Sequence, residues 1–131
     1  MVEIAMPAVN ASLRVDEGGT LHLKWTPGVT IAAADADAVI FAIRSLGGTT
    51  LQPILVELSE VNVSPEARST LQTEHFVSAV AVVGASIVDQ VVSVALLRNQ
   101  KYPTGYFTSV GEAREWLSTL PAPDILAESV V

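Results

Sequence analysis

Residues 76–97 read FVSAVAVVGASIVDQVVSVALL and carry a single formal charge, at Asp89. The stretch is long and apolar enough to resemble a membrane span, but Gly84 and Ser86 interrupt it with turn and cap residues. Asp89 would also lie near the middle of the bilayer, at a cost of several kcal/mol. Ser86 followed three residues later by an acid is typical of a helix N-terminus. We therefore predict no transmembrane segment but a buried strand and a buried helix, over residues 77–83 and 87–99.

The segments on either side continue this alternation of strands and helices. Apolar and polar residues alternate through 11–26, which predicts a β-hairpin with one face in water, the face that carries His22. The other predicted elements are helix 33–46, strand 54–58, helix 65–74, strand 106–108 and helix 110–120. Strands separated by single helices pair in parallel through right-handed crossovers. The predicted fold class is therefore α/β, with a mostly parallel central sheet, an antiparallel N-terminal hairpin and flanking helices.

Composition limits the classes of function. The chain has 131 residues, 50% of them hydrophobic, and no cysteine. This length fits one domain over 1–131, with a core at about 11–120 and a C-terminal tail at 121–131. The absence of cysteine excludes disulfides and thiolate chemistry, and the net charge of −7 argues against nucleic-acid binding. Residues 1–15 lack the pattern of a secretory signal, so we expect a cytoplasmic protein.

Residue types suited to catalysis or metal binding are few. The two histidines, His22 and His75, fall in different predicted elements, and no nucleotide-binding, nucleophile-elbow or zinc motif occurs. Glu57, Ser59 and Glu60 follow the third strand, where open parallel sheets bind ligands, but a polar strand end explains them equally well. We expect no catalytic residue, no metal and no cofactor, and therefore a protein that is not an enzyme.

Arg98, Lys101 and Tyr102 form the one concentrated basic patch. The helical wheel places Arg98 within the apolar arc of residues 87, 91, 94 and 95. A partly buried arginine requires an anionic partner, either a bound anion or an internal carboxylate, and we favour the carboxylate. The candidates are Glu57, Glu60 and Asp89.

Phe41 and Leu97 are apolar residues on helix faces that are otherwise polar. Together with the high hydrophobic content, they indicate more apolar surface than a core of this size consumes. A homodimer interface or a pocket for an apolar ligand would use the excess.

Several segments resemble the STAS superfamily, which includes the bacterial anti-sigma-factor antagonists of the SpoIIAA type. The resemblance begins where strand 54–58 leads through Ser59-Glu60-Val61 into Ser64-Pro65-Glu66-Ala67-Arg68. An uncharacterised bacterial STAS-like family is more similar still, through that segment, strand 79–83, Lys101-Tyr102-Pro103-Thr104, Phe107-Thr108-Ser109, Ala113 and Trp116-Leu117. The resemblance implies a SpoIIAA-like fold over most of the chain.

The antagonists switch on a phosphorylatable serine at the start of the helix after the third strand. The matching positions here hold Pro65, Glu66, Ala67 and Arg68, so the resemblance implies a domain without that serine. Glu66 would place a permanent negative charge at the helix start, and Ser64 would act as its N-cap. Ser64 and Glu66 thus mark a candidate regulatory helix start.

These observations support a non-enzymatic regulatory or protein-interaction domain, which we expect to be homodimeric and to bind a protein partner. Alternatively, the domain binds a small apolar or amphipathic ligand whose anionic head meets Arg98 or Arg68, a reading also favoured by a resemblance of STAS-like folds to the CRAL-TRIO lipid-binding domains. A third reading is an enzyme that uses Glu57, Ser59 and Arg68. A closed apolar cavity would favour ligand binding, whereas a flat patch around Phe41 and Leu97 would favour protein interaction. The candidate binding residues are Phe41, Arg68, Leu97, Arg98 and Tyr102.

Overall fold

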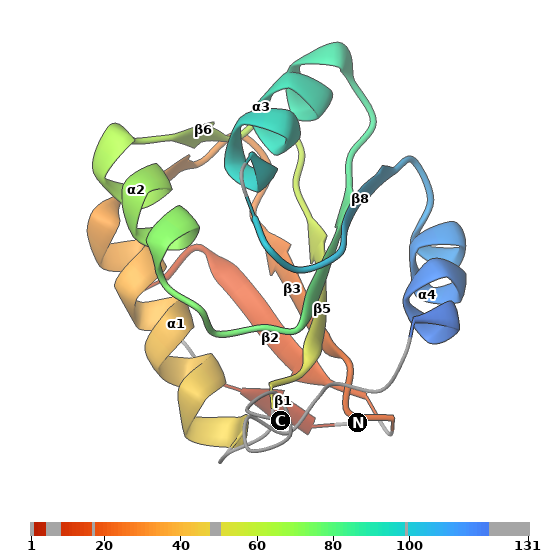
Figure 1. The fold of residues 1–131 in the computed structure, drawn as a ribbon. Coiled ribbons are helices and arrows are strands. Elements are labelled where there is room, and N and C mark those ends of the chain that lie inside the picture. Colours follow the sequence, from red (N-terminus) through yellow and green to blue (C-terminus); the bar gives the residue numbers. More distant parts are fainter. Residues whose placement is uncertain (1, 5–8, 17, 48–50, 99, 121–131) are drawn as a thin grey trace.

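The computed structural model describes residues 2–4, 9–16, 18–47, 51–98 and 100–120, so the predicted tail at 121–131 lies outside the described residues. Within these residues, six strands form the main sheet in the order β1-β2-β3-β5-β7-β8 (Figure 1). Their bounds are β1 Val2–Ile4, β2 Ala11–Val15, β3 Leu21–Trp25, β5 Pro53–Glu57, β7 Ala79–Val83 and β8 Thr104–Phe107. The helices are α1 Ala33–Gly47, α2 Pro65–Thr73, α3 Ile87–Leu97 and α4 Val110–Thr119.

The topology confirms the predicted fold class. Strands β2 and β3 form the antiparallel hairpin, and β3, β5, β7 and β8 pair in parallel. Two short strands, β4 Thr30–Ile31 and β6 Asn62–Val63, pair in parallel outside the main sheet. The strand β1 was not predicted: it pairs antiparallel with β2, and its three residues are too few to show a periodic pattern.

The parallel strands are covered on both faces, and alternate residues serve two separate cores. On one face, Ile54, Val80 and Val82 join the larger cluster with residues of α1 and α2. On the other face, Leu55, Ala81 and Val83 pack with Ala113 and Leu117 of α4. Figure 1 shows this division, with α1 and α2 on the side of the sheet opposite α4.

The predicted wet face of the hairpin is wrong at its centre. His22 is 5% exposed, because α4 covers the same face of the neighbouring strand β5 and its Arg114 reaches the imidazole. The hairpin pattern predicted the strands correctly but did not show that an arginine 92 positions after His22 contacts its side chain.

Each of the last three helices begins at a serine N-cap, as predicted for Ser64 and Ser86. Ser64, Ser86 and Ser109 accept hydrogen bonds from the backbone N–H groups of Ala67, Asp89 and Glu112. The reciprocal bond of a capping box is present at Ser86 and Asp89. Stretch 76–97 is thus divided between β7 and α3, and none of the described helices has the length and apolarity that crossing a bilayer demands.

Candidate functional site

Asp89 anchors the start of α3 above the carboxyl ends of β5 and β7. Its side chain is 1% exposed. The carboxylate accepts hydrogen bonds from the backbone N–H of Glu60 at 2.7 Å, of Ala85 at 2.8 Å and of Ser86 at 3.1 Å. One side chain therefore joins the loop after β5 to the loop after β7.

Those hydrogen bonds control the charge of Asp89. Burial on its own would raise the pKa of this carboxyl, but the N–H groups of Ala85, Glu60 and Ser86 outweigh that effect and lower the pKa below its ordinary 3.8. Burial is the larger cause that raises the pKa of Tyr106, and the negative charge of Asp89 raises it further. Asp89 is therefore a structural anion whose oxygens are occupied by the backbone.

Gly84 allows the close approach that this anchor needs. A Cβ atom at this position would lie 2.6 Å from the Cβ of Asp89 and 2.7 Å from the hydroxyl of Tyr106. No side chain can occupy that space without displacing α3 or β8.

The anchor rotates α3 so that its polar side faces inward. Asp89 and Ser93 are the fully buried residues of the helix, and the Ser93 hydroxyl donates to the backbone oxygen of Asp89. Four large aliphatic side chains point outward instead. Their exposed fractions are 75% for Ile87, 51% for Val88, 63% for Val91 and 54% for Val94. We call these four residues the outer face of α3.

This orientation corrects the prediction for Arg98. Arg98 does share a helix face with residues 87, 91 and 94, but that face is in solvent, and Arg98 is exposed at the C-cap of α3. The predicted internal carboxylate partner is absent from the described ion pairs, which join His22 to Glu57, Arg44 to Glu74 and Arg114 to Asp16. Of the two other candidate partners, Glu60 accepts a hydrogen bond from the Ser86 hydroxyl, and Asp89 accepts hydrogen bonds from the backbone.

An apolar cavity of about 80 Å³ lies between the sheet and the helices on its larger-core face. Two of the predicted binding residues, Leu97 and Tyr102, line it, and Tyr102 stacks on His75 with ring centroids 6.1 Å apart. Burial raises the pKa of the Tyr102 hydroxyl. Leu97 was expected on a polar, outward face, but it is partly buried against the core. The remaining lining includes Trp25, Ile54, Val56, Leu71, Phe76, Val80, Leu96 and Gln100.

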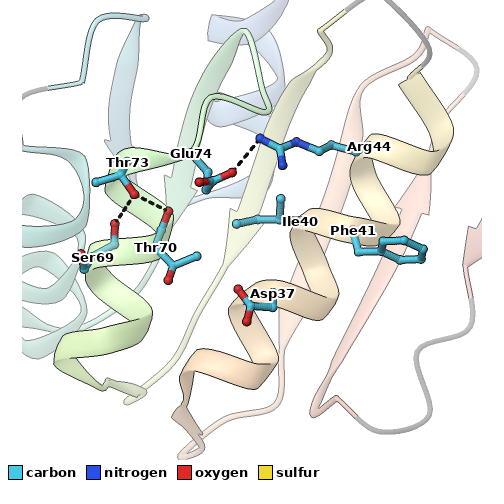
Figure 2. Close-up of a pocket in the computed structure, with 8 residues that line it drawn as sticks. All are labelled: Asp37, Ile40, Phe41, Arg44, Ser69, Thr70, Thr73 and Glu74. Carbon is cyan, nitrogen blue, oxygen red and sulfur yellow. Dashed lines mark hydrogen bonds and ion pairs between the residues drawn. The ribbon is translucent and has the colours of Figure 1, made fainter.

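Phe41 lies elsewhere, 75% exposed on α1. It is one of the residues around a groove of about 390 Å³ between α1 and α2, where Arg44 donates to Glu74 at 2.8 Å. Figure 2 shows Asp37, Ile40 and Arg44 directed toward α2, whereas the Phe41 ring projects to the other side of α1. Phe41 and Leu97 therefore do not form one patch.

The candidate regulatory residues lie at the first turn of α2. Ser64 is the N-cap, and its hydroxyl accepts from the Ala67 N–H at 3.0 Å. Glu66 and Arg68 are both exposed. The structure places Arg68 on α2 and Arg98 at the end of α3, so the two arginines belong to separate elements.

The sequence did not predict a hydrogen-bonded network of four charged or polar side chains. Arg114 donates to Asp16 at 3.1 Å and to Nδ1 of His22 at 3.0 Å, and Nε2 of His22 lies 2.5 Å from Glu57. Because arginine only donates, Nδ1 is the acceptor and Nε2 carries the proton that is donated to Glu57. Nδ1 thus helps to hold α4 against the sheet, and Nε2 links β3 to β5.

Within the described ranges, no three His, Asp or Glu side chains gather as a metal site requires. Alternation along β3 and β5 could have placed His22 and Glu57 on one face, but no local signal pairs either with Arg114.

The strand order and the packing of the helices define a fold class, and comparison with solved structures supports the same class. An uncharacterized protein of the DUF3478 family from Shewanella loihica PV-4, described as having a SpoIIAA-like fold, superposes with a TM-score of 0.60. The two sequences are 15% identical, and the match covers 82% of this chain and 91% of that one. This likeness confirms the SpoIIAA-like fold.

Residues 13–121 match the family described as Domain of unknown function (DUF7793), and the chain belongs to that family. A protein with unknown function from Arthrobacter sp. FB24 is 28% identical over 82% of this chain and 92% of its own, with a TM-score of 0.33. No curated protein matches the sequence.

Proposed function

We propose that this protein is a non-enzymatic regulatory domain that acts by pairing with a second copy of itself through the outer face of α3. The observation that carries the proposal is the exposure of Ile87, Val88, Val91 and Val94 on one side of an 11-residue helix. Single exposed aliphatic residues are ordinary, but a contiguous apolar face marks an interaction surface.

The energetics favour a weak, reversible pair. Burying one Val or Ile side chain completely is worth about 1.5–3 kcal/mol, before the losses of association are subtracted. A pair of short helices covers less than the roughly 1,200 Å² of a stable complex. We therefore expect a dissociation constant in the micromolar range or above, so that protein concentration controls the paired fraction, as suits a regulatory domain.

The side chains considered for catalysis are separated, which supports a role without chemistry. Glu57 bonds to His22 on the face of the sheet that α4 covers. Arg68 lies on α2, which packs on the opposite face. A reaction would need these groups around one substrate.

Sedimentation of the purified protein over a wide concentration range tests the proposal. We expect the wild type to show a concentration-dependent dimer, and Val91→Glu to weaken it at least about 10-fold, because the carboxylate would be desolvated in the interface. Phe41→Glu is the matched control, since Phe41 is also exposed but lies on α1. A wild type that stays monomeric at the highest concentration, or a dimer weakened by Phe41→Glu and not by Val91→Glu, would overturn the proposal.

The apolar cavity favours a second candidate function, the binding of an aliphatic chain. Arg98 and Lys101 are exposed and adjoin the cavity-lining residues Leu97, Gln100 and Tyr102 in the chain. An anionic head could therefore be bound beside an aliphatic tail. A cavity of about 80 Å³ is smaller than the roughly 300 Å³ of a typical small-molecule site, so only a short part of such a chain fits without expansion.

Titration with dodecanoate and with dodecanol, followed by methyl NMR, tests this candidate. We expect saturable shifts at Leu97, weaker dodecanoate binding in Arg98→Gln, and dodecanol binding that this variant does not change. Shifts confined to surface methyl groups such as those of Val91 would count against a cavity ligand.

A further inference from the structure

We infer that the second copy docks antiparallel, across a two-fold axis at the middle of α3, so that Arg98 of each copy meets Glu60 of the other. This inference rests on the proposed pairing through the outer face of α3. It adds the direction of the two helices and the charged pair that sets their register.

The spacing along α3 defines where the axis must cross. Residues 87, 91, 94 and 98 follow intervals of four, three and four, so they lie in one row on a helix. An antiparallel two-fold axis between Val91 and Val94 places Val91 opposite the partner's Val94. The same axis places Ile87 opposite the partner's Arg98, so that both ends of the row come into register together.

Opposite charges lie near the two ends of α3, with Arg98 in the row and Glu60 beside the helix start. Arg98 is exposed at the C-terminal end, and the described ion pairs leave it without a carboxylate. At the N-terminal end, the exposed Glu60 accepts a hydrogen bond from the Ser86 hydroxyl at 2.7 Å. An antiparallel pair brings each arginine to a glutamate, whereas a parallel pair would bring like charges together at both ends.

Glu60 is held in place for this contact before any partner arrives. Its backbone has φ of 53°, in the left-handed region that non-glycine residues rarely adopt, and its N–H is bonded to the buried carboxylate of Asp89. The Glu60 backbone is therefore held in place, and the Ser86 hydroxyl positions the Glu60 carboxylate beside the first turn of α3, so little order is lost when a partner binds.

The arginine is suited to both halves of the contact. Its aliphatic stem can lie along the partner's Ile87, which is 75% exposed, while the guanidinium reaches the carboxylate. Antiparallel helices also bring each N-terminal end beside a C-terminal end, which their macrodipoles favour.

A charge-reversal cycle measured by sedimentation tests the arrangement. We expect Arg98→Glu and Glu60→Arg each to weaken the dimer about 3- to 10-fold, and the double variant to recover the wild-type constant within about 2-fold. Glu60→Arg keeps the backbone N–H that Asp89 binds. Lys101→Glu and Glu66→Lys are matched controls with exposed charges outside the row, and we expect no weakening from either beyond about 2-fold.

The absence of cysteine allows an independent test by engineered disulfides. We expect an oxidised equimolar mixture of Val91→Cys and Val94→Cys proteins to form mainly the mixed 91–94 crosslink. The antiparallel arrangement would be overturned by dominant 91–91 and 94–94 crosslinks, or by a double charge reversal that does not restore the dimer. If the wild type still forms a dimer in that case, the proposed pairing itself stands. A monomeric wild type would instead refute the proposed function.

Discussion

Oδ1 of Asp89 lies 2.7 Å from the backbone nitrogen of Glu60 and accepts its hydrogen bond, which joins the start of α3 to the loop that follows β5. We expect Asp89→Asn to lower the free energy of unfolding at neutral pH by about 2 kcal/mol, because an amide nitrogen would face N–H donors that the carboxylate now satisfies. Urea denaturation measures the change. Asp35→Asn at the exposed start of α1, where the carboxylate accepts from Ala32 N–H at 2.8 Å, serves as control and should lose no more than about 1 kcal/mol. Equal losses at both positions would contradict a special role for Asp89.

The same carboxylate predicts a pH dependence of stability. The pKa of Asp89 in the folded protein is below the 3.8 of the free side chain, because the hydrogen bonds from Ala85, Glu60 and Ser86 outweigh burial. Its contribution is therefore complete well above pH 3.8 and is lost progressively as the pH falls past 3.8 and through the lower folded-state value. Urea denaturation at a series of pH values should show wild type losing more stability than Asp89→Asn between about pH 5 and about pH 2. Parallel curves for the two proteins would be the contrary result.

Gly84 gives a second, purely steric prediction. Gly84→Ala would place a Cβ 2.6 Å from that of Asp89, so we expect a loss of about 1–3 kcal/mol in unfolding free energy. Gly111→Ala is the matched control, since its Cβ would meet nothing closer than the Ser109 hydroxyl at 3.8 Å in helix α4. That control should gain up to about 1 kcal/mol. A Gly84→Ala protein as stable as wild type would show that the contact relaxes freely.

The Arg114 network predicts different costs for two arginines. Arg114→Gln should destabilise the fold by about 1–3 kcal/mol, because it leaves the buried His22 and its partner Glu57 without their link to α4. Arg44→Gln removes an ion pair whose side chains are 52% and 41% exposed, and should cost no more than about 0.5 kcal/mol. Thermal unfolding of the two variants checks this order. The network requires a larger loss of stability for Arg114→Gln than for Arg44→Gln.

Helix caps supply a final prediction. Ser64→Ala removes the hydroxyl that accepts from Ala67 N–H, and we expect a loss of about 1 kcal/mol. Ser118→Ala is the control, because its hydroxyl donates to a helix carbonyl at the exposed end of α4 and should contribute little. Chemical denaturation of both variants separates a capping role from a general serine effect.

Local patterns predicted most of the fold because its elements carry their own signals. The serine caps at 64, 86 and 109 fix three helix starts, and the apolar run of β7 announces a strand buried on both faces. The rotation of α3 had no such signal. Apolar residues lie almost all round this helix, so its sequence alone does not decide which side faces the core. Contacts of the buried Asp89 decide it, among them the hydrogen bond from Glu60, 29 positions away.

The candidate site was harder to predict for the same reason. Arg98 was correctly grouped with residues 87, 91 and 94, but the group faces solvent and not the core. Contacts such as Arg114 with His22 join positions 92 residues apart, and only the assembled sheet and helix bring them together. The residue pattern within one helix or strand does not predict contacts between residues so far apart in the sequence.

The edge strands of the main sheet influence how copies of this protein can associate. Its outermost strands, β1 and β8, are only three and four residues long. Short outer strands present few free backbone groups to a neighbouring chain, which discourages strand addition and the growth of fibrils. Contacts that leave the sheet intact, made by side chains on a helix, can therefore form and dissolve without risk of runaway polymerisation.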